Sequence, residues 1–170
     1  MTPAPATVVV RDATASDLPA LLRIYNAVIA ESTAVFSDDP VTLEERTRWW
    51  QARTAQGYPV LVAGAADEVL GFASFGDFRS WPGYRYTVEH SVHVDGAQRG
   101  RGIGCALMRQ LLPRATALGK HMMVAGIDAA NAGSIRFHER LGFERAGLLR
   151  EVGFKFGRRL DLALLQRGLD

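Results

Sequence analysis

The stretch QRGRGIG, residues 98–104, places three glycines, two arginines and a glutamine between a valine-rich segment and the amphipathic segment CALMRQLL. A helix start exposes main-chain N–H groups that have no partner within the helix, and the macrodipole adds about half a positive charge there. Glycines let such a backbone approach a ligand closely, and arginine forks match phosphate oxygens. The stretch therefore predicts an anion site, with phosphate as the natural ligand, at a strand-to-helix junction.

Two common phosphate motifs fit this stretch poorly. A Walker loop ends in Gly-Lys-Ser or Gly-Lys-Thr, whereas Gly102 is followed by Ile103, Gly104 and Cys105, which excludes it. A dinucleotide fingerprint lacks its third glycine here, although Asp128 stands where its ribose-binding acid is expected. The dinucleotide reading stays open, and so does a glycine-rich turn with solvated arginines.

Composition indicates one globular domain over residues 1–170. Hydrophobic residues make up 48% and charged residues 22%, and the formal net charge is only +2 with the basic residues dispersed, so we expect no nucleic-acid partner. No apolar run of about 18 residues and no leader segment is present, which predicts a cytoplasmic protein without a membrane partner. The single Cys105 is expected to pack in the core, and no metal site is expected.

Hydrophobic periodicity predicts a mixed α+β fold in which about four helices cover a mostly antiparallel twisted sheet of about seven strands. Ser16 is the expected N-cap of the first helix, and Thr42 with Glu45 forms a capping box for a second helix that ends at Gly57. The remaining helices are expected at 102–118, which contains Pro113, and within 131–143. Strands are expected at 7–13, 59–65, 69–75, 84–94, 121–127, 144–151 and 160–167.

The strand predicted at 84–94 has a clean period of two. One face is core-like and carries Tyr86, Val88, His90, Val92 and Val94, whereas the other is polar and carries Arg85, Thr87, Glu89, Ser91 and His93. A carboxylate in mid-strand is unusual for packing alone. Glu89 is therefore a candidate general base, and a surface pairing with Arg85 or His93 is its structural alternative.

The pattern Q-R-x-x-G-x-G at 98–104 resembles the acyl-CoA pyrophosphate loop of the GNAT superfamily of N-acetyltransferases, and NAGSIRFHERLGF at 131–143 resembles that family's second signature. The resemblance implies a GNAT-like fold and acetyl-CoA as co-substrate. The residues that it assigns to the cofactor are Val92, His93, Val94, Gln98, Arg99, Gly100, Arg101, Gly102, Ile103, Gly104, Asn131 and Ser134.

Three further segments, YRYTVEHSVHV, FHERLGF and VGFKFGRRLDLALLQ, resemble the phosphinothricin and methionine-sulfone N-acetyltransferases. This branch implies a small amino-acid acceptor, cytoplasmic location and a homodimer. The chain departs from the branch at Trp81, where an arginine is common, at Arg159, where a tryptophan is common, and at His93, where a tyrosine is common. These departures leave the transfer chemistry intact and bear on which acceptor is used.

Acetyl transfer to an amine needs a neutral nucleophile, hydrogen-bond donors for the oxyanion and a proton for the thiolate that leaves. Glu89 is expected to accept the amine proton, and main-chain N–H groups near Val92–Val94 are expected to bind the oxyanion if the strand splays or bulges. His138 is expected to donate a proton to the thiolate or to position the thioester. The residues expected at the acceptor are Phe36, Arg79, Arg85 and Thr87, with Trp81 as a further wall.

The leading hypothesis is an acetyl-CoA-dependent N-acetyltransferase that acts on the α-amine of a phosphinothricin, methionine sulfone or methionine sulfoximine type of amino acid. Two alternatives remain at this stage. One is a GNAT enzyme acting on a protein N-terminus or an antibiotic amine, and the other is a non-catalytic acyl-CoA or dinucleotide-binding module.

Overall fold

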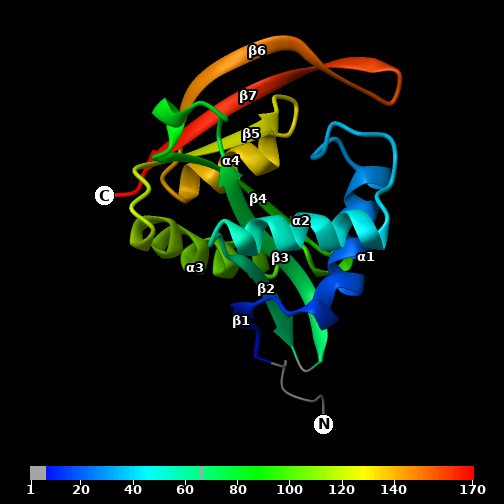
Figure 1. Ribbon diagram of the computed structural model, residues 1–170. Coiled ribbons are helices and arrows are strands. Elements are labelled where there is room, and N and C mark those ends of the chain that lie inside the picture. Colours follow the sequence, from blue (N-terminus) through cyan, green and yellow to red (C-terminus); the bar gives the residue numbers. More distant parts are fainter. Residues whose placement is uncertain (1–6, 66) are drawn as a thin grey trace.

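The structure, a computed structural model, describes residues 7–65 and 67–170. Its strands form one seven-stranded sheet in the order β1-β2-β3-β4-β5-β7-β6, shown in Figure 1. The strands are β1 (Val9–Asp12), β2 (Val60–Ala65), β3 (Glu68–Asp77), β4 (Thr87–Val94), β5 (Met122–Asp128), β6 (Glu144–Lys155) and β7 (Arg158–Gly168). The helices are α1 (Leu18–Glu31), α2 (Leu43–Ala55), α3 (Ile103–Ala117) and α4 (Ala132–Arg140). The expected fold class is confirmed.

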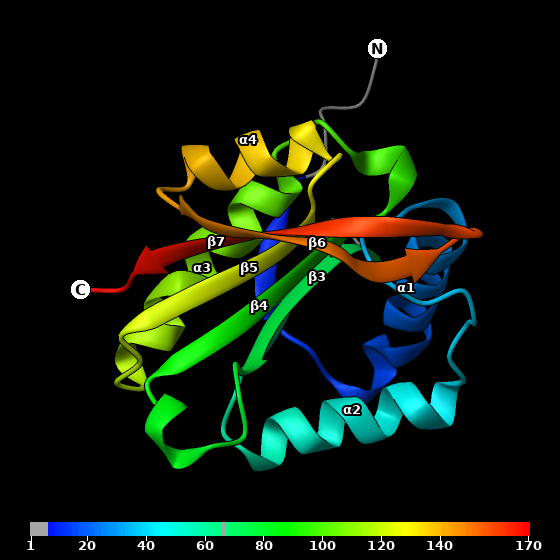
Figure 2. The same ribbon diagram turned by 90° about the horizontal axis from the view of Figure 1, so that it is seen from above.

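Helices lie on both faces of the sheet, as Figure 2 shows. Alternation along β2 sends Leu61 and Ala63 into a core with α3 and α4, and sends Val60 and Val62 into a second core with α1. Neighbouring strands are antiparallel except for β4 and β5, which run parallel. The chain reaches β5 from β4 through α3, as a parallel crossover requires.

Most element boundaries follow the local sequence rules. The capping box is confirmed: Glu45 N donates to Thr42 Oγ1 at 3.2 Å, and Thr42 N donates to Glu45 Oε2 at 2.7 Å. The Ser16 prediction was wrong, because residues Ala15–Asp17 form a 3₁₀ turn capped by Thr14 and Asp17 is the N-cap of α1. The Asp17 carboxylate fixes that turn by accepting from Thr14 N at 2.7 Å and from both terminal nitrogens of Arg11.

Several predicted boundaries needed correction: the strand expected at 144–151 runs on to Lys155, and two further corrections concern β4 and α3. The strand expected from residue 84 begins only at Thr87, because Pro82–Tyr84 form a 3₁₀ turn. Helix α3 ends at Ala117, so Leu118 follows the helix and is exposed rather than packed with its apolar face. The helix continues through Pro113, which lies on its exposed side, where water can satisfy the carbonyl that proline leaves unpaired.

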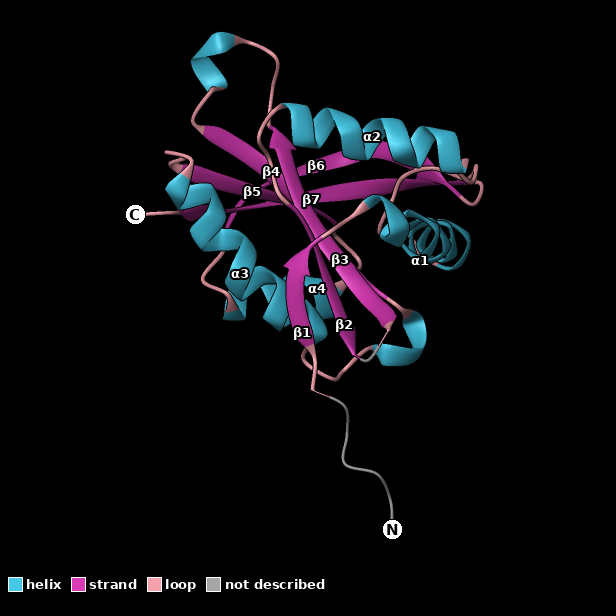
Figure 3. Cartoon of the chain, turned by 60° about the horizontal axis from the view of Figure 1, so that its bottom comes forward, coloured by secondary structure: helices cyan, strands magenta, loops and turns pink. Residues whose placement is uncertain are grey.

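Strands β4 and β5 are paired over only three positions. Thr87, Val88 and Glu89 pair with Met122, Met123 and Val124, after which β4 continues to Val94 and β5 to Asp128 without pairing to each other. On its other edge β4 stays paired with β3 up to Val94 without a register shift. The sheet, seen obliquely in Figure 3, therefore opens between its two central strands.

Lys155 ties the end of α1 to β6. Its side chain is fully buried, and Nζ donates to the main-chain oxygens of Ile29 at 2.6 Å, Ser32 at 2.6 Å and Val35 at 2.8 Å. Helix C-termini leave carbonyls without intrahelical partners, and an ammonium group satisfies them while complementing the macrodipole. Phe36, in the same segment, packs against Gly153 so closely that a Cβ atom at Gly153 would overlap its ring.

Replacing this ammonium group should destabilise the fold. We expect Lys155→Met to lower the free energy of unfolding by about 3 kcal/mol, because three buried or partly buried main-chain carbonyls lose a charged donor. Urea titration followed by circular dichroism measures the change. Arg158→Met, on an exposed residue of the same hairpin, should change stability by about 0.5 kcal/mol or less. Equal losses in the two variants would contradict the role given to Lys155.

Candidate active site

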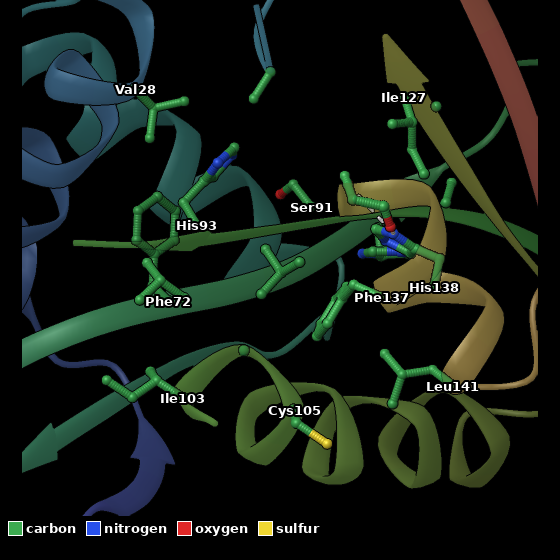
Figure 4. Close-up of a pocket in the computed structure, with 18 of the residues that line it drawn as sticks. Val28, Phe72, Ser91, His93, Ile103, Cys105, Ile127, Phe137, His138 and Leu141 are labelled. Atoms are coloured by element: carbon green, nitrogen blue, oxygen red, sulfur yellow. Dashed lines mark hydrogen bonds between the residues drawn. The ribbon is translucent and has the colours of Figure 1, made fainter. Parts of the chain in front are cut away.

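A cavity of about 1780 Å³ opens where β4 and β5 part. Its walls come from β4, β5, the start of α3 and α4, and from α1 and α2 on the opposite side. In Figure 4, His93 and Phe72 lie near Val28 at one side, and Phe137 and His138 lie at the other. Cys105 lies on α3 and lines the cavity rather than the closed core expected for it.

The pairing pattern shows which main-chain groups of β4 face the opening. Asp95 N donates to Leu70 O at 2.9 Å, and Phe78 N donates to Thr87 O at 3.3 Å. In an antiparallel ladder such hydrogen-bonded residues alternate with residues whose N–H and C=O groups point the other way. The main-chain groups of Val92 and Val94 therefore point toward β5, beyond the last β4–β5 pair, whereas those of His93 point toward β3. Of the two conditions named for oxyanion donors near Val92–Val94, a splay or a bulge, the structure has the first: β4 parts from β5 there, and β4 has no bulge.

Glu89 occupies the last paired position of β4 before the opening. Its carboxylate extends over β5, where a Cβ atom at Gly126 would lie 3.0 Å from Oε1. The group is half-buried, and burial raises the pKa of Glu89, which the positive charge of Arg79 partly opposes. Gly126 thus leaves room for the Glu89 carboxylate. Because its pKa is raised, this carboxylate keeps its proton to a higher pH than an exposed carboxylate does.

The glycine-rich stretch leads directly into α3, as the sequence predicted. Gly100 and Gly102 have φ angles of 76° and 78°, and a Cβ atom at either would meet nothing within 4 Å. Gly102 is the N-cap and has no side-chain capping bond among the described residues. The first N–H groups of α3 therefore face an open surface, which suits an anion. Gly104 has a different role, because a Cβ atom there would lie 3.3 Å from the ring of Phe137.

Helix α4 brings its predicted residues to the same cavity. Asn131 is the N-cap, and its Oδ1 accepts from Ser134 N at 3.0 Å. His138 Nδ1 lies 2.7 Å from Ser134 O, and His138 Nε2 lies 3.2 Å from His90 Nε2. Because a carbonyl oxygen only accepts, His138 carries its proton on Nδ1, and His90 must then donate from Nε2. His90 Nδ1 is left as a buried atom without a partner.

Both imidazoles of this pair are held neutral. Burial lowers the pKa of His90 to about 3, with His138 as a further cause, and burial also lowers the pKa of His138. Both ring nitrogens of His138 are already engaged, one with a main-chain carbonyl and one with His90. The contacts therefore fix the orientation of the ring.

The structure gathers most of the predicted site residues and leaves others outside. Those that line the cavity are Glu89, Val92, His93, Val94, Gln98, Arg99, Gly100, Gly102, Ile103, Gly104, Asn131, Ser134 and His138. Those that do not line it are Phe36, Arg79, Arg85, Thr87 and Arg101. The first lies on Gly153, and Arg79 and Arg85 are exposed and stack on the neighbouring rings of Phe78 and Tyr86. Arg101 bonds to Gln98 Oε1, and Trp81 is 73% exposed.

Asp128 does not support the dinucleotide reading. One carboxylate oxygen accepts from Thr33 Oγ1, and the other accepts from Ala130 N at 3.0 Å. The side chain is buried and joins the segment after α1 to the end of β5. Its hydrogen-bonding capacity is thus used within the fold rather than offered to a ribose.

Sequence reasoning missed the contribution of α2. Arg46 and Arg53 line the cavity, together with Tyr25 and Trp49. Arg46 is 5% exposed, and its guanidinium lies 3.8 Å from the centre of the Tyr25 ring. The available signal was the spacing of these arginines, which are seven residues apart and so share a helix face with the intervening Trp49.

Comparisons with a family model and with individual proteins all identify acetyltransferases as the relatives of this chain. Residues 21–143 match the model of the acetyltransferase (GNAT) family. The chain is 52% identical over 162 residues to an L-methionine sulfoximine/L-methionine sulfone acetyltransferase of Pseudomonas paraeruginosa, covering 95% of this chain and 94% of that protein. It is 39% identical over 170 residues to a phosphinothricin N-acetyltransferase of Streptomyces coelicolor, covering 98% and 99%.

A solved structure shows the same fold with a ligand. An acetyltransferase from Salmonella typhimurium with its cofactor acetyl-CoA superposes with a TM-score of 0.93 at 46% sequence identity, covering 96% of this chain and 94% of that one. No helix in residues 7–65 and 67–170 is long and apolar enough to cross a membrane.

The neutral histidine pair predicts a pH-dependent stability. A histidine whose pKa is lowered on folding binds a proton only in the unfolded chain at intermediate pH, so its stabilising contribution is complete above about pH 6.5. We expect the free energy of unfolding to fall as the pH drops from about 6.5 toward 3, the pKa of folded His90. Urea midpoints at pH 7 and pH 5 measure this loss. His90→Gln should reduce the difference, whereas His121→Gln, at an exposed site, should leave it unchanged; the reverse pattern would refute the assignment.

Proposed function

The chain belongs to the acetyltransferase (GNAT) family and is an N-acetyltransferase, and from that premise we propose that it transfers the acetyl group of acetyl-CoA to the α-amine of a small amino acid. The proposed acceptors are of the methionine sulfone, methionine sulfoximine or phosphinothricin type. The observation that carries the proposal is the position of Glu89, half-buried at the opening between β4 and β5 and beside the outward-facing main chain of Val92 and Val94. The names of the relatives support the acceptor class.

The cofactor half of the cavity has the chemistry that a coenzyme A diphosphate requires. Open space beside Gly100 and Gly102, uncapped N–H groups of α3 and the charge of Arg99 would bind the diphosphate. The amide-rich pantetheine arm of coenzyme A would bind to the main chain of Val92 and Val94, as a peptide binds to a strand edge. The Asn131 side chain would add a further hydrogen bond to this arm. When bound, the cofactor supplies the thioester carbonyl that the amine attacks.

In the proposed reaction Glu89 accepts the proton of the incoming amine, directly or through water, so that nitrogen can attack as the neutral species. The N–H groups of Val92 and Val94 face the opening and are the candidate donors to the developing oxyanion. We assign His138 a positioning role, because both of its ring nitrogens are already hydrogen-bonded. A thiol has a pKa near 8.5, so the thiolate leaves with little need for an acid.

Thiol release from acetyl-CoA in the presence of a panel of amines tests this function. We expect turnover with methionine sulfone and related amino acids, and Glu89→Gln should lower kcat by about 10²- to 10⁴-fold because the amine loses its base. A base works only when ionised, and burial raises the pKa of Glu89. As the pH is lowered, the wild-type rate should therefore begin to fall at a pH above about 4.3, the pKa of an ordinary glutamate, because Glu89 takes up a proton there. The Glu89→Gln variant should lack this decrease.

Two results would remove these assignments. Equal turnover by wild type and Glu89→Gln would end the role of Glu89 as the base. Peptide amines that react where methionine sulfone is inert would replace the acceptor class with a protein N-terminus.

We also propose that the chain acts as a homodimer through β6. This strand lies at the edge of the sheet, and Leu148, Leu149, Val152 and Phe154 of β6, with Phe156 of the following turn, are between 43% and 62% exposed. A long apolar edge strand normally has a covering partner. Light scattering coupled to size exclusion should give about twice the 18.6 kDa of one chain. Phe154→Glu should shift the protein toward monomer, and a monomeric wild type would refute the proposal.

A further inference from the structure

Helix α2 presents two guanidinium groups, those of Arg46 and Arg53, to the cavity. Arg46 and Arg53 form no ion pair within 4.0 Å among the described residues, and both Nε atoms are buried without a hydrogen-bond partner. Burial lowers the pKa of each, and the charge of Asp77 only partly opposes this for Arg53. Taking a charge out of water without a partner is costly, and a bound anion would offset that cost for the buried Arg46 and the half-buried Arg53. Arg46 is stacked against Tyr25 and Trp49, which leaves Arg53 as the less constrained of the two.

The Arg53 guanidinium and the Glu89 side chain lie on the same face of the sheet. A Cβ atom at Gly76 of β3 would overlap its guanidinium, so Arg53 occupies the place where a side chain of residue 76 would be. Gly76 is the pairing partner of Glu89 across the β3–β4 ladder. Directly opposed residues in antiparallel strands direct their side chains to the same face. The guanidinium therefore lies over β3, on the face of the sheet from which the Glu89 side chain projects.

The Glu89 carboxylate lies on the β5 side of its own strand, over Gly126. Since neighbouring strands are about 4.8 Å apart, groups lying over β3 and β5 are separated by roughly 10 Å. Gly76 thus leaves room for the guanidinium on one side of β4, and Gly126 leaves room for the carboxylate on the other. Two hydrogen bonds of about 2.9 Å and the three covalent bonds that join an α-amine nitrogen to its carboxylate oxygen span a gap of about this size.

Building on the proposed function, we propose that Arg53 binds the α-carboxylate of the acceptor and thereby places its α-amine at Glu89. A planar guanidinium suits a carboxylate through two parallel N–H···O bonds. An amine that lacks the carboxylate leaves Arg53 unpaired, so this residue selects free amino acids against simple amines and peptide N-termini. Arg79 and Arg85, which the sequence suggested for this role, lie outside the cavity.

Methionine sulfone and its primary amide form the test pair, because they share the amine and the side chain and differ in the carboxylate. We expect wild type to prefer the acid in kcat/KM. Arg53→Met should lower kcat/KM for the acid by about 10- to 100-fold, through KM more than kcat, and leave the amide nearly unchanged. The amide amine ionises at lower pH, so the informative quantity is the change in the acid-to-amide ratio between variants. KM for acetyl-CoA should stay constant, which also shows that the variant is folded.

A second variant tests the position of Arg53 without removing its charge. Gly76→Ala introduces a methyl group where the guanidinium now lies, and it should reduce the acid-to-amide ratio in the same direction. Arg53→Lys keeps the charge without the planar fork and should retain part of the preference. The matched control is Arg48→Met, on an exposed residue of the same helix that pairs with Glu44 at 3.2 Å, and it should leave the ratio unchanged.

The outcomes separate this assignment from the function on which it rests. Loss of acid and amide turnover in equal measure in Arg53→Met, or an unchanged ratio, would overturn the role of Arg53. Collapse of the ratio in Arg79→Met instead would transfer the role to that residue. If wild type acetylates the acid and the amide equally, the carboxylate site is wrong while the acetyltransferase function stands. If wild type acetylates neither, the proposed acceptor class fails and the assignment fails with it.

Discussion

After the Glu89–Val124 pair, β4 and β5 part, and the groups assigned to the transfer chemistry lie around the gap that this parting leaves. Had the two strands stayed paired, the main chain of Val92 and Val94 would be used in the ladder and unable to bind a ligand. Unpaired main-chain groups away from water are costly, so the opening is stable only when water or a ligand occupies it. The same parting brings the N-termini of α3 and α4 to one cavity, since α3 follows β4 and α4 follows β5.

Burial sets the electrostatic character of the cavity in a consistent direction. It raises the pKa of Glu89 and lowers those of His90, His93 and His138, so each group is pushed toward its neutral form. The pKa of His93 is lowered to about 4, with Arg46 as a further cause. Neutral imidazoles keep one donor and one acceptor each, which allows the His90–His138 contact to orient the ring on α4. The fixed positive charges that remain lie at the glycine-rich start of α3, where the diphosphate is proposed to bind, and along α2.

Contacts away from Glu89 hold the proposed acceptor side of the cavity together. Lys155 of β6 binds the carbonyls at the end of α1, and Asp128 at the end of β5 binds Thr33. Between them they hold the segment that joins α1 to α2, and Asn26 adds a pair of bonds to Val41 just before α2 begins. The placement of Arg46 and Arg53 on α2 thus depends on contacts from β5, β6 and α1. The side chains that make these contacts have no proposed part in the reaction.

The sequence by itself determined the order of elements, the two faces of β4, the glycine-rich helix start and Glu89 as the acidic residue of interest, because local periodicity and capping rules act within a few residues. It named main-chain N–H groups near Val92–Val94 as oxyanion donors only on the condition that the strand splays or bulges, and the structure shows that β4 and β5 part there without a bulge in β4. Only the tertiary structure decided that Phe36, Arg79 and Arg85 lie outside the cavity and that Arg46 and Arg53 lie inside it. Those positions depend on how α2 packs across β3, on Gly76 and Gly126 flanking Glu89 from other strands, and on the contact between His90 and His138. Such long-range packing leaves no periodic trace in a single sequence, which is why the strand proposed to carry the base could be predicted from the residues and the proposed acceptor side could not.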